Sequence, residues 1–347
     1  MPVVMADRLH RLVETLLVKA GASAEEARIV AGHQVEANLV GHDSHGVHLL
    51  PTYLERIRRG HIVPGAPIEV LDETPTTARV DGHWGFGQVV STRAMELAIR
   101  KAREHRVAIV TVFRQSHVGR LGDYPLMAVR AGLVGLMMCD SGQAPKQVAP
   151  FGGREARLGT NPLAIAFPSD LEAPVLIDMA TSAVAGGKIA VALARGTSIP
   201  TGWILDRDGN PTTDPAALQA GGVMLPLGGP EGHKGYALSF AVETLAALLP
   251  GLGFGADPAG RHNDGAFLLA FDPGAFRPLA EFRAEVGAFA RYLKAAPPAA
   301  GFTEVLYPGE LEYRTALSRR RDGIPVEDRT WERLAALARA ADLGHLV

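Results

Sequence analysis

The chain has 347 residues, of which 47% are apolar and 21% charged, and this composition excludes a fibrous or largely disordered protein. The 35 basic and 37 acidic residues give a formal net charge of −2, which lacks the basic excess that nucleic-acid binding requires. The most apolar stretch, 236–256, is interrupted by Glu243, Pro250 and three glycines, so no segment is predicted to span a membrane. Because a single core rarely exceeds about 250–300 residues, we expect two packed domains.

Cysteine use and the N-terminal residues bear on the cellular compartment. Cys139 is the only cysteine in the sequence, so an internal disulfide is impossible and a reducing, cytoplasmic setting is expected. The first residues include Asp7 and contain no apolar run of the length found in signal peptides. We therefore expect a soluble cytoplasmic protein with neither nucleic acid nor membrane as a partner.

The first part of the chain is predicted to be helical. Ser23 followed by Glu26 is a capping-box pattern, and apolar residues at helical spacing continue to Val40. A second helix is expected over 47–59, because Gly60 is typical of the position just after a helix C-terminus. The next expected elements are a strand at 77–81, a helix at 88–105, a strand at 107–113, a helix at 124–130 and a strand at 133–138.

The rest of the chain continues with strands and ends in helices. The expected elements are strands at 163–167, 175–178 and 203–205, a helix at 236–249, a strand at 266–271, and helices at 278–294 and 330–341. Helices at both ends around a strand-rich middle predict a helical domain assembled from both termini, 1–72 with 276–347. The segment 73–275 is then expected to form an α/β domain.

One dinucleotide-binding fingerprint occurs, but its context is wrong. The glycine pattern of a Rossmann site spans 251–256, and its mechanism needs a strand before it and a helix after it. Here an apolar helix is expected before the pattern, and Asp257-Pro258 follows it. The sequence therefore predicts a loop at this point and no Rossmann site.

Three histidines lie three residues apart before a predicted helix. His42, His45 and His48 could bind a metal ion together with Asp43, as in a metal-dependent hydrolase. Positions at this spacing drift around a helix, however, and no pair of ligands elsewhere completes a closed set, so we expect no metal. The alternative is a polar cluster at a helix entry, in which Ser44 and His45 present a hydroxyl and an imidazole to one spot.

A second histidine cluster follows the predicted strand at 107–113. The ends of strands are where open α/β sheets usually present their reactive groups. His117 taken alone is typical of a hydrogen-bonded structural residue, but Ser116 and Arg120 beside it give a functional role equal weight.

Several loops carry groups suited to an anion or a sugar. The glycine-rich turns 149–153 and 159–162 expose N–H groups that suit phosphate or carboxylate oxygens, although plain hairpin turns have the same composition. Segment 178–182 follows a predicted strand with an acid and two hydroxyls that could hold a ribose. Lys234 lies at a helix start, where backbone donors and a cation would meet an anion.

Taken together, these segments resemble the type 2 malate/L-lactate dehydrogenase family over nearly the whole chain. The matching segments in chain order are 43–46, 51–53, 116–119, 150–153, 159–162, 178–182, 211–214, 233–236, 263–265 and 308–310. The family includes ureidoglycolate and sulfolactate dehydrogenases. Within it, the segments 37–39 and 319–325 and the position of Arg120 are most similar to hydroxycarboxylate dehydrogenase B.

The resemblance implies a fold and an activity. The implied fold is α/β (α+β), with a mixed, largely antiparallel sheet flanked by helices in place of a Rossmann fold, and a helical domain from both termini. The implied activity is NAD- or NADP-dependent interconversion of small 2-hydroxy acids and 2-oxo acids within the α/β domain, and a homodimer is expected. The alternatives are a reductase of cyclic imino acids such as Δ1-piperideine-2-carboxylate and a non-catalytic dinucleotide-binding protein.

The resemblance also implies roles for individual residues. His117 corresponds to the proton acceptor and donor, and a histidine near its ordinary pKa of about 6.5 suits that task. Ser44 and His45 correspond to catalytic positions beside the substrate and the nicotinamide. The implied substrate-binding residues are Arg120, His48, Tyr53 and Thr160. The implied cofactor-binding residues are His45, Arg120, Ser141, Asp178, Met179, Ala180, Lys234, Asn263, Gly309 and Glu310.

One departure from the family concerns the substrate carboxylate. Many members carry an arginine five residues after the serine of Ser-His-Gly, where this chain has Leu49. A carboxylate that loses water in a closed site needs a cationic partner. His48, Arg56 and Arg120 are the candidates, and we favour Arg120. Leu49 and Leu50 are then expected to widen the pocket for bulky 2-hydroxy acids.

Overall fold

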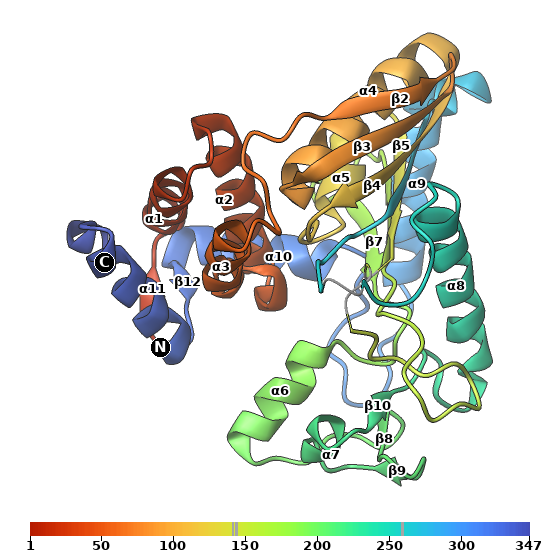
Figure 1. Ribbon diagram of the computed structural model, residues 1–347. Coiled ribbons are helices and arrows are strands. Elements are labelled where there is room, and N and C mark those ends of the chain that lie inside the picture. The colour runs from red at the N-terminus through yellow and green to blue at the C-terminus, as the bar shows by residue number, and fades with distance from the viewer. Residues whose placement is uncertain (141, 143–144, 258–259) are drawn as a thin grey trace.

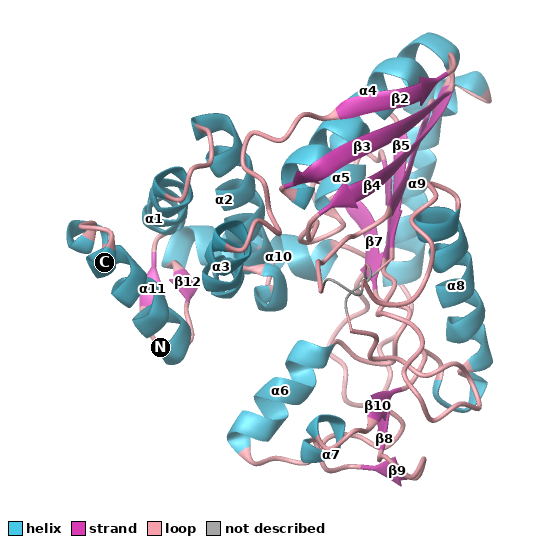
Figure 2. Ribbon diagram, in the orientation of Figure 1, coloured by secondary structure: helices cyan, strands magenta, loops and turns pink. Residues whose placement is uncertain are grey.

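The computed structural model in Figure 1 describes residues 1–347 except 141, 143–144 and 258–259. Its elements form a helical domain, a sheet domain and a small lobe, and Figure 2 shows helices gathered around the sheet and at both chain ends. Both termini lie on the helical domain (Figure 1). Among the described residues, no helix is long and apolar enough to cross a membrane.

The helical domain is built from both ends of the chain, as the sequence predicted. Its elements are α1 (Ala6–Lys19), α2 (Ala24–Leu39), α3 (Leu50–Arg58), α10 (Glu310–Asp322), α11 (Asp328–Ala340) and the antiparallel strand pair β1 (Val3–Val4) and β12 (Ile324–Pro325). Their apolar faces share one core that includes Leu12, Val30 and Leu334. At the start of α2, Ser23 and Glu26 form the predicted capping box.

The sheet domain contains one sheet of seven strands. In spatial order these are β2 (Glu69–Glu73), β3 (Thr77–Gly85), β4 (Val107–Gln115), β11 (Ala266–Phe271), β5 (Val134–Cys139), β6 (Leu163–Phe167) and β7 (Val175–Met179). Neighbours β3 and β4 are parallel and are joined by α4 (Gly87–His105), whereas the other neighbours pair antiparallel. The expected mixed, largely antiparallel sheet is confirmed, and β2 is a strand that the sequence did not predict.

Helices cover both faces of the sheet. The covering elements are α4, α5 (Asp123–Arg130), α8 (His233–Glu243), the π-helical segment Thr244–Leu248 that continues α8, and α9 (Leu279–Lys294). On one face, α4 and α5 pack on side chains such as Val110 and Leu268. On the opposite face, Ala246 packs on Phe267. The alternation of inward residues along β11 therefore serves two cores, one on each face.

A small lobe lies below the sheet in the view of Figure 1. It consists of α6 (Gly186–Arg195), α7 (Ala216–Gln219) and three short strands in the order β10 (Val223–Met224), β8 (Ile204–Leu205) and β9 (Pro211–Thr212). Its separate core includes Val148, Ile189 and Ile204. The sequence predicted the strand at β8, but it did not predict α6.

Two elements at the edges of the expected domains pack with the sheet. Strand β2 pairs with β3, and Ala290 of α9 packs with Ala173 and Tyr307 next to β7. Both elements therefore pack with the sheet, although all but the last residue of β2 and the whole of α9 lie in the segments 1–72 and 276–347, which were expected to form the helical domain.

Candidate active site

His117 lies in the loop after β4, where the helical domain meets the sheet. The N–H of Val118 donates to Oδ2 of Asp264 at 3.1 Å. Gly87 at the start of α4 permits a close approach on the other side, because a Cβ there would lie 2.1 Å from the carbonyl oxygen of Ser116. The loop is therefore held between the first turn of α4 and the segment that precedes β11.

Tyr53 and Gln88 connect His117 to two helices. The hydroxyl of Tyr53, on α3, lies 2.7 Å from Nδ1 of His117, and Nε2 of Gln88, on α4, donates to the same hydroxyl at 2.7 Å. Both Tyr53 and Gln88 are only 1% exposed. The sequence predicted Tyr53 as a substrate-binding residue, but its hydroxyl contacts the imidazole, and Gln88 was not predicted.

Two further imidazoles lie beside His117. The ring of His45 is nearly parallel to it with 5.7 Å between centroids, and the ring of His262 meets it edge-on at 5.4 Å. Oγ of Ser44 lies 3.0 Å from Nδ1 of His45. The structure therefore brings Ser44, His45 and His117 together from separate segments, and His262 joins them.

Asn38 of α2 shapes the turn that carries His45. Its side-chain nitrogen donates to Oδ1 of Asp43 at 2.6 Å, and its side-chain oxygen accepts the N–H of Val47 at 2.9 Å. Gly46 passes so close that a Cβ there would lie 2.2 Å from this oxygen. The glycine of the Ser-His-Gly motif is thus required by a buried amide and not by the imidazole itself.

Burial keeps the two stacked histidines neutral at pH 7. It lowers the pKa of His117 to about 3 and that of His45 to about 4. Burial raises the pKa of Asp264, but the nearby His262 and His117 outweigh that effect, so the pKa of this carboxyl is lowered overall. The expectation that His117 has an ordinary histidine pKa is therefore wrong, because its ring is removed from water.

His262 and Asp264 form a contact that was not predicted from the sequence. Nε2 of His262 lies 2.6 Å from Oδ1 of Asp264, whose side chain is 3% exposed. The sequence held a signal for this contact, because the two residues flank Asn263, a predicted cofactor-binding residue, just before β11. Since β11 pairs with β4, residues before β11 reach the loop after β4 and thus His117.

Arg120 is buried between two carboxylates. Its Nη1 donates to Oδ1 of Asp123 at 2.7 Å, and its Nε lies 3.3 Å from Oδ2 of Asp178. Asp178 also accepts the N–H of Gly122 at 2.9 Å, and Nδ1 of His33 lies 3.2 Å from Asp123. Arg120 and Asp178, which the sequence predicted as ligand-binding residues, are therefore partners of each other.

The other predicted substrate-binding residues have different surroundings. Burial lowers the pKa of His48, and its Nδ1 has no hydrogen-bond partner among the described residues. The carbonyl of Thr160 accepts both the N–H and the hydroxyl of Thr181. Leu50 is fully buried in the helical core, and Leu49 packs against that core. The expectation that Leu50 widens a substrate pocket is therefore wrong, because core side chains surround it.

Two of the predicted cofactor-binding segments meet at β7. Residues 178–180 lie at its end, and the N–H of Leu176 donates at 3.1 Å to the carbonyl of Pro308, just before Gly309. Gly309 has a φ of 94°, a conformation that favours glycine. Glu310 is buried and ion-paired with two basic side chains of α9 and α10.

The remaining predicted cofactor contacts are dispersed. The side chain of Lys234 is 70% exposed at the start of α8 and lies 3.1 Å from Glu231, with no contact to 178–180 in the described parts of the chain. Asn263 is buried, and its Oδ1 has no hydrogen-bond partner among the described residues. Ser141 lies outside the described residues.

Buried polar atoms beside His117 fit a nicotinamide dinucleotide. Neither Oγ of Ser116 nor Oδ1 of Asn263 has a hydrogen-bond partner in the part of the chain that the structure describes. Such atoms are costly to bury without a partner, and a carboxamide offers both donors and an acceptor. The residues present therefore fit the cofactor, with Ser116 and Asn263 as candidates for its carboxamide.

The three histidines at 42, 45 and 48 have separate environments. Nε2 of His42 lies 3.5 Å from Glu312, whereas His45 contacts Ser44. Across the described residues, no group of three or more His, Cys, Asp or Glu side chains is arranged to hold a metal ion. The geometry therefore gives the hydrolase interpretation no support.

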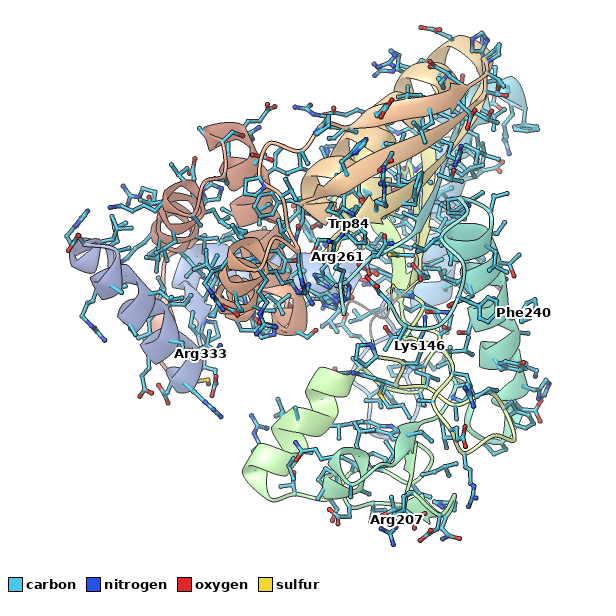
Figure 3. All side chains as sticks on the ribbon, in the orientation of Figure 1. Trp84, Lys146, Arg207, Phe240, Arg261 and Arg333 are labelled. Atoms are coloured by element: carbon cyan, nitrogen blue, oxygen red, sulfur yellow. The ribbon has the colours of Figure 1, made fainter. Side chains whose placement is uncertain are left out.

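A buried lysine, Lys146, lies between the sheet and the small lobe (Figure 3). Its Nζ lies 3.3 Å from Oε1 of Glu243, and the two side chains are 8% and 10% exposed. Nδ2 of Asn161 donates to the other carboxylate oxygen at 2.8 Å. The sequence did not predict this pair, because 97 residues separate its members along the chain.

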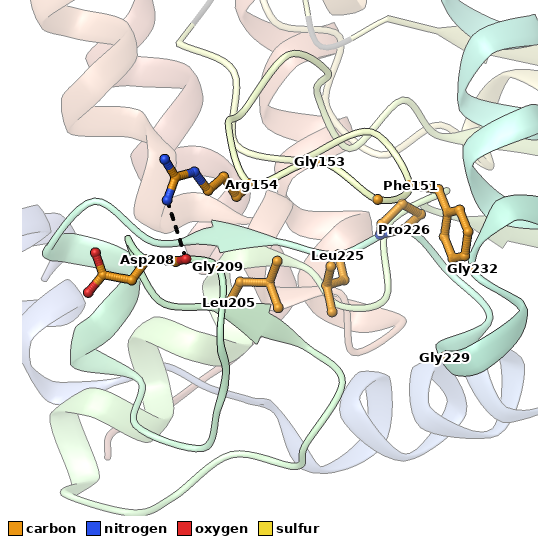
Figure 4. A pocket seen from close by; sticks show the side chains of 11 residues that line it. Phe151, Gly153, Arg154, Leu205, Asp208, Gly209, Leu225, Pro226, Gly229 and Gly232 are labelled. Carbon is orange, nitrogen blue, oxygen red and sulfur yellow. Dashed lines mark hydrogen bonds between the residues drawn. The ribbon is translucent and has the colours of Figure 1, made fainter.

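A cavity of about 410 Å³ opens on the small lobe (Figure 4). It is lined by the glycine-rich loop 151–154, by the turn after β8 and by Gly232 at the start of α8. The side chain of Arg154 donates at 3.4 Å to the carbonyl of Asp208. The turn predicted to suit an anion therefore lines this cavity, whose walls include none of the residues clustered around His117.

Sequence comparisons place these features in context. A profile described as malate/L-lactate dehydrogenase matches residues 4–335. The L-sulfolactate dehydrogenase of Methanothermobacter thermautotrophicus is 39% identical over 339 residues, which cover 96% of this chain and 95% of the relative. Hydroxycarboxylate dehydrogenase B of Escherichia coli is 35% identical over 339 residues, which cover 96% of this chain and 93% of the relative.

Comparison with solved structures also finds a malate dehydrogenase. The crystal structure of malate dehydrogenase from Entamoeba histolytica matches with a TM-score of 0.94 at 32% identity and covers 98% of each chain. Fold and relatives together define a dehydrogenase of hydroxycarboxylic acids. The chain belongs to the malate/L-lactate dehydrogenase family.

Proposed function

We propose that this enzyme interconverts 2-hydroxy acids and 2-oxo acids by hydride transfer with NAD or NADP, and that His117 accepts and donates the proton. The observation that carries the proposal is the environment of His117, an imidazole kept neutral by burial and held 2.7 Å from the hydroxyl of Tyr53. Its neighbours His45 and Ser44 belong to the motif through which the chain resembles its family. Membership of the family supports the hydroxy-acid chemistry.

The residues of the chain account for the proton part of the reaction. When bound, the dinucleotide supplies the hydride acceptor or donor. During oxidation, the substrate hydroxyl loses its proton as the hydride leaves carbon, and the neutral imidazole of His117 has a lone pair to receive it. Asp264 raises the pKa of His117 against the effect of burial, so it stabilises the imidazolium that forms. In reduction, the same ring returns the proton to the developing alkoxide.

Other residues are proposed to bind and orient the two ligands. Ser116 and Asn263 are the candidates for the carboxamide of the nicotinamide, and Asp178 and Gly309 at β7 are candidates for the rest of the dinucleotide. Arg120 is our candidate for the substrate carboxylate, because it lies three residues after His117 and its charge is permanent. A substrate carboxylate bound to Arg120 would be the third carboxylate on this guanidinium, which already contacts Asp123 and Asp178.

A panel of substrates tests the proposal. Oxidation of NADH and of NADPH is followed with 2-oxo acids of increasing size and with Δ1-piperideine-2-carboxylate, each with and without EDTA. We expect turnover of 2-oxo acids that the chelator does not change. Turnover of the imine alone would favour the imino-acid reductase. Loss of activity with EDTA would favour a metal enzyme, and tight NADH binding without any turnover would favour a binding protein.

We further propose that the enzyme is a cytoplasmic homodimer. Large apolar side chains on and after α8 and on α9 are exposed, including Phe240 at 61%, Leu249 at 57%, Phe289 at 62% and Tyr292 at 75%, and Figure 3 shows Phe240 at the outer side of α8. Exposed apolar side chains of this size favour burial in an interface. Light scattering should give twice the chain mass of 36.7 kDa, and a monomer would contradict the proposal.

A further inference from the structure

We propose that Tyr53 and Gln88 are positioning residues that hold His117 with its hydrogen on Nδ1, so that Nε2 exchanges the proton with the substrate. This inference rests on the proposed function, because it names the atom of His117 that does the chemistry. Neither Tyr53 nor Gln88 is proposed to touch the substrate.

The three groups form one continuous hydrogen-bond chain. Gln88 Nε2 donates to the hydroxyl oxygen of Tyr53 at 2.7 Å, and the same oxygen lies 2.7 Å from Nδ1 of His117. The hydroxyl hydrogen has an acceptor in the carbonyl oxygen of His117 at 3.5 Å. A tyrosine hydroxyl has two lone pairs and one hydrogen. One arrangement satisfies all three contacts: the oxygen accepts from Gln88 and from Nδ1–H, and the hydroxyl donates to the carbonyl.

This arrangement matches the task proposed for His117. A neutral imidazole has one hydrogen, and the nitrogen without it carries the lone pair. Because Tyr53 covers Nδ1, a proton acceptor must present the lone pair at Nε2. As the C–H hydride passes to the dinucleotide, the O–H proton passes to Nε2 and the C=O bond forms. The resulting imidazolium keeps its Nδ1–H bond to Tyr53 and later releases the Nε2 proton.

Packing alone does not account for polar side chains at positions 53 and 88. Tyr53 and Gln88 are each 1% exposed, and apolar side chains of similar volume would fill the same space without polar atoms to satisfy. Burial also raises the pKa of Tyr53, so the hydroxyl stays protonated and cannot remove the Nδ1 hydrogen. The two residues come from α3 and α4, and they fix the ring of His117 from two directions.

Histidine-selective ¹⁵N NMR tests the tautomer without any substrate. The signals of His117 are assigned as those that disappear in His117→Gln. We expect neutral His117 to carry its hydrogen on Nδ1 in the wild-type protein and to shift toward Nε2–H in Tyr53→Phe. Hydrogen on Nε2 in the wild-type protein would overturn the proposal, because the hydroxyl would then donate to Nδ1.

Kinetics of matched variants test the consequence. Tyr53→Phe and Gln88→Met should each lower kcat roughly 10–100-fold, while the dissociation constant of NADH stays within about twofold. The control is Ser91→Ala, which removes another buried hydrogen bond of α4, from Ser91 to Gln115 at 2.9 Å, without touching the chain to His117. It should leave kcat unchanged.

A third variant separates positioning from simple structural support. Gln88→Glu places a carboxylate beside the Tyr53 hydroxyl, which should strengthen the Nδ1–H bond and raise the pKa of His117, so the acidic limb of the pH–rate profile should move upward. An unchanged profile in this variant, or wild-type kcat in a folded Tyr53→Phe, would overturn the proposal. Absence of turnover in every protein, with the expected tautomer present, would instead refute the proposed function.

Discussion

Nε of Arg120 lies 3.3 Å from Oδ2 of Asp178, so two residues with separate predicted ligand roles form one buried pair. Burial raises the pKa of Asp178, and the guanidinium works in the opposite direction. Asp123 bonds the same guanidinium at 2.7 Å. A ligand carboxylate that binds Arg120 must therefore do so in the presence of two protein carboxylates.

Replacing this arginine should affect stability and substrate binding together. Arg120→Met leaves two buried carboxylates without their cation, which should lower the free energy of unfolding by about 3–5 kcal/mol. If Nη2 binds the substrate, the KM for 2-oxo acids should also rise while NADH affinity holds. Urea unfolding and initial rates measure both effects. Weaker NADH binding with an unchanged substrate KM would assign the guanidinium to the cofactor.

Removal of the imidazole at 117 should abolish most of the turnover without unfolding the protein. His117→Ala is expected to lower kcat by about 10²–10⁴, the usual contribution of general acid–base catalysis, and to leave NADH binding nearly unchanged. The matched control is His105→Ala, at the exposed end of α4, which should behave as wild type. Retention of more than half of the wild-type rate in His117→Ala would remove this residue from the mechanism.

The lowered histidine pKa values predict a dependence of stability on pH. His117 and His45 have pKa values of about 3 and about 4 in the folded protein, compared with about 6.5 in an unfolded chain. Between these values the unfolded chain binds more protons, so these histidines make the free energy of unfolding increase from about pH 4 to about pH 6.5 and then level off. Urea unfolding of wild type and His45→Gln across this range should show a shallower slope for the variant. Equal slopes would contradict the lowered pKa of His45.

The exposed lysine at the start of α8 offers a test of cofactor binding. Lys234→Ala should raise the KM for the dinucleotide with a smaller effect on kcat, because a point charge on a phosphate binds ground and transition states alike. Lys188→Ala, which removes an exposed lysine of α6, is the control for net charge. A raised substrate KM with constant cofactor affinity would show that the prediction for Lys234 is wrong.

Local signals in the sequence predicted local structure well. The Ser23–Glu26 capping box starts α2 as expected, and His117 lies after a strand as its position indicated. The partners of His117 were harder to foresee, because they depend on the order of strands in the sheet. Strand β11 inserts between β4 and β5, and this places Asp264 against Val118 across 146 residues of sequence. Nothing in the local sequence distinguishes Gln88 from other polar residues on a helix, because its role depends on the contact with Tyr53 of α3.

The pairing of β1 with β12 has a consequence for the synthesis of the protein. Helices α1 to α3 leave the ribosome long before α10 and α11, with which they share one apolar core. The sheet domain can therefore become compact before α10 and α11 have been synthesised and can pack on the N-terminal helices. Nascent or prematurely terminated chains would display an open apolar surface on these helices. Chaperones are thus expected to bind the chain from the synthesis of α1 until α11 has been synthesised.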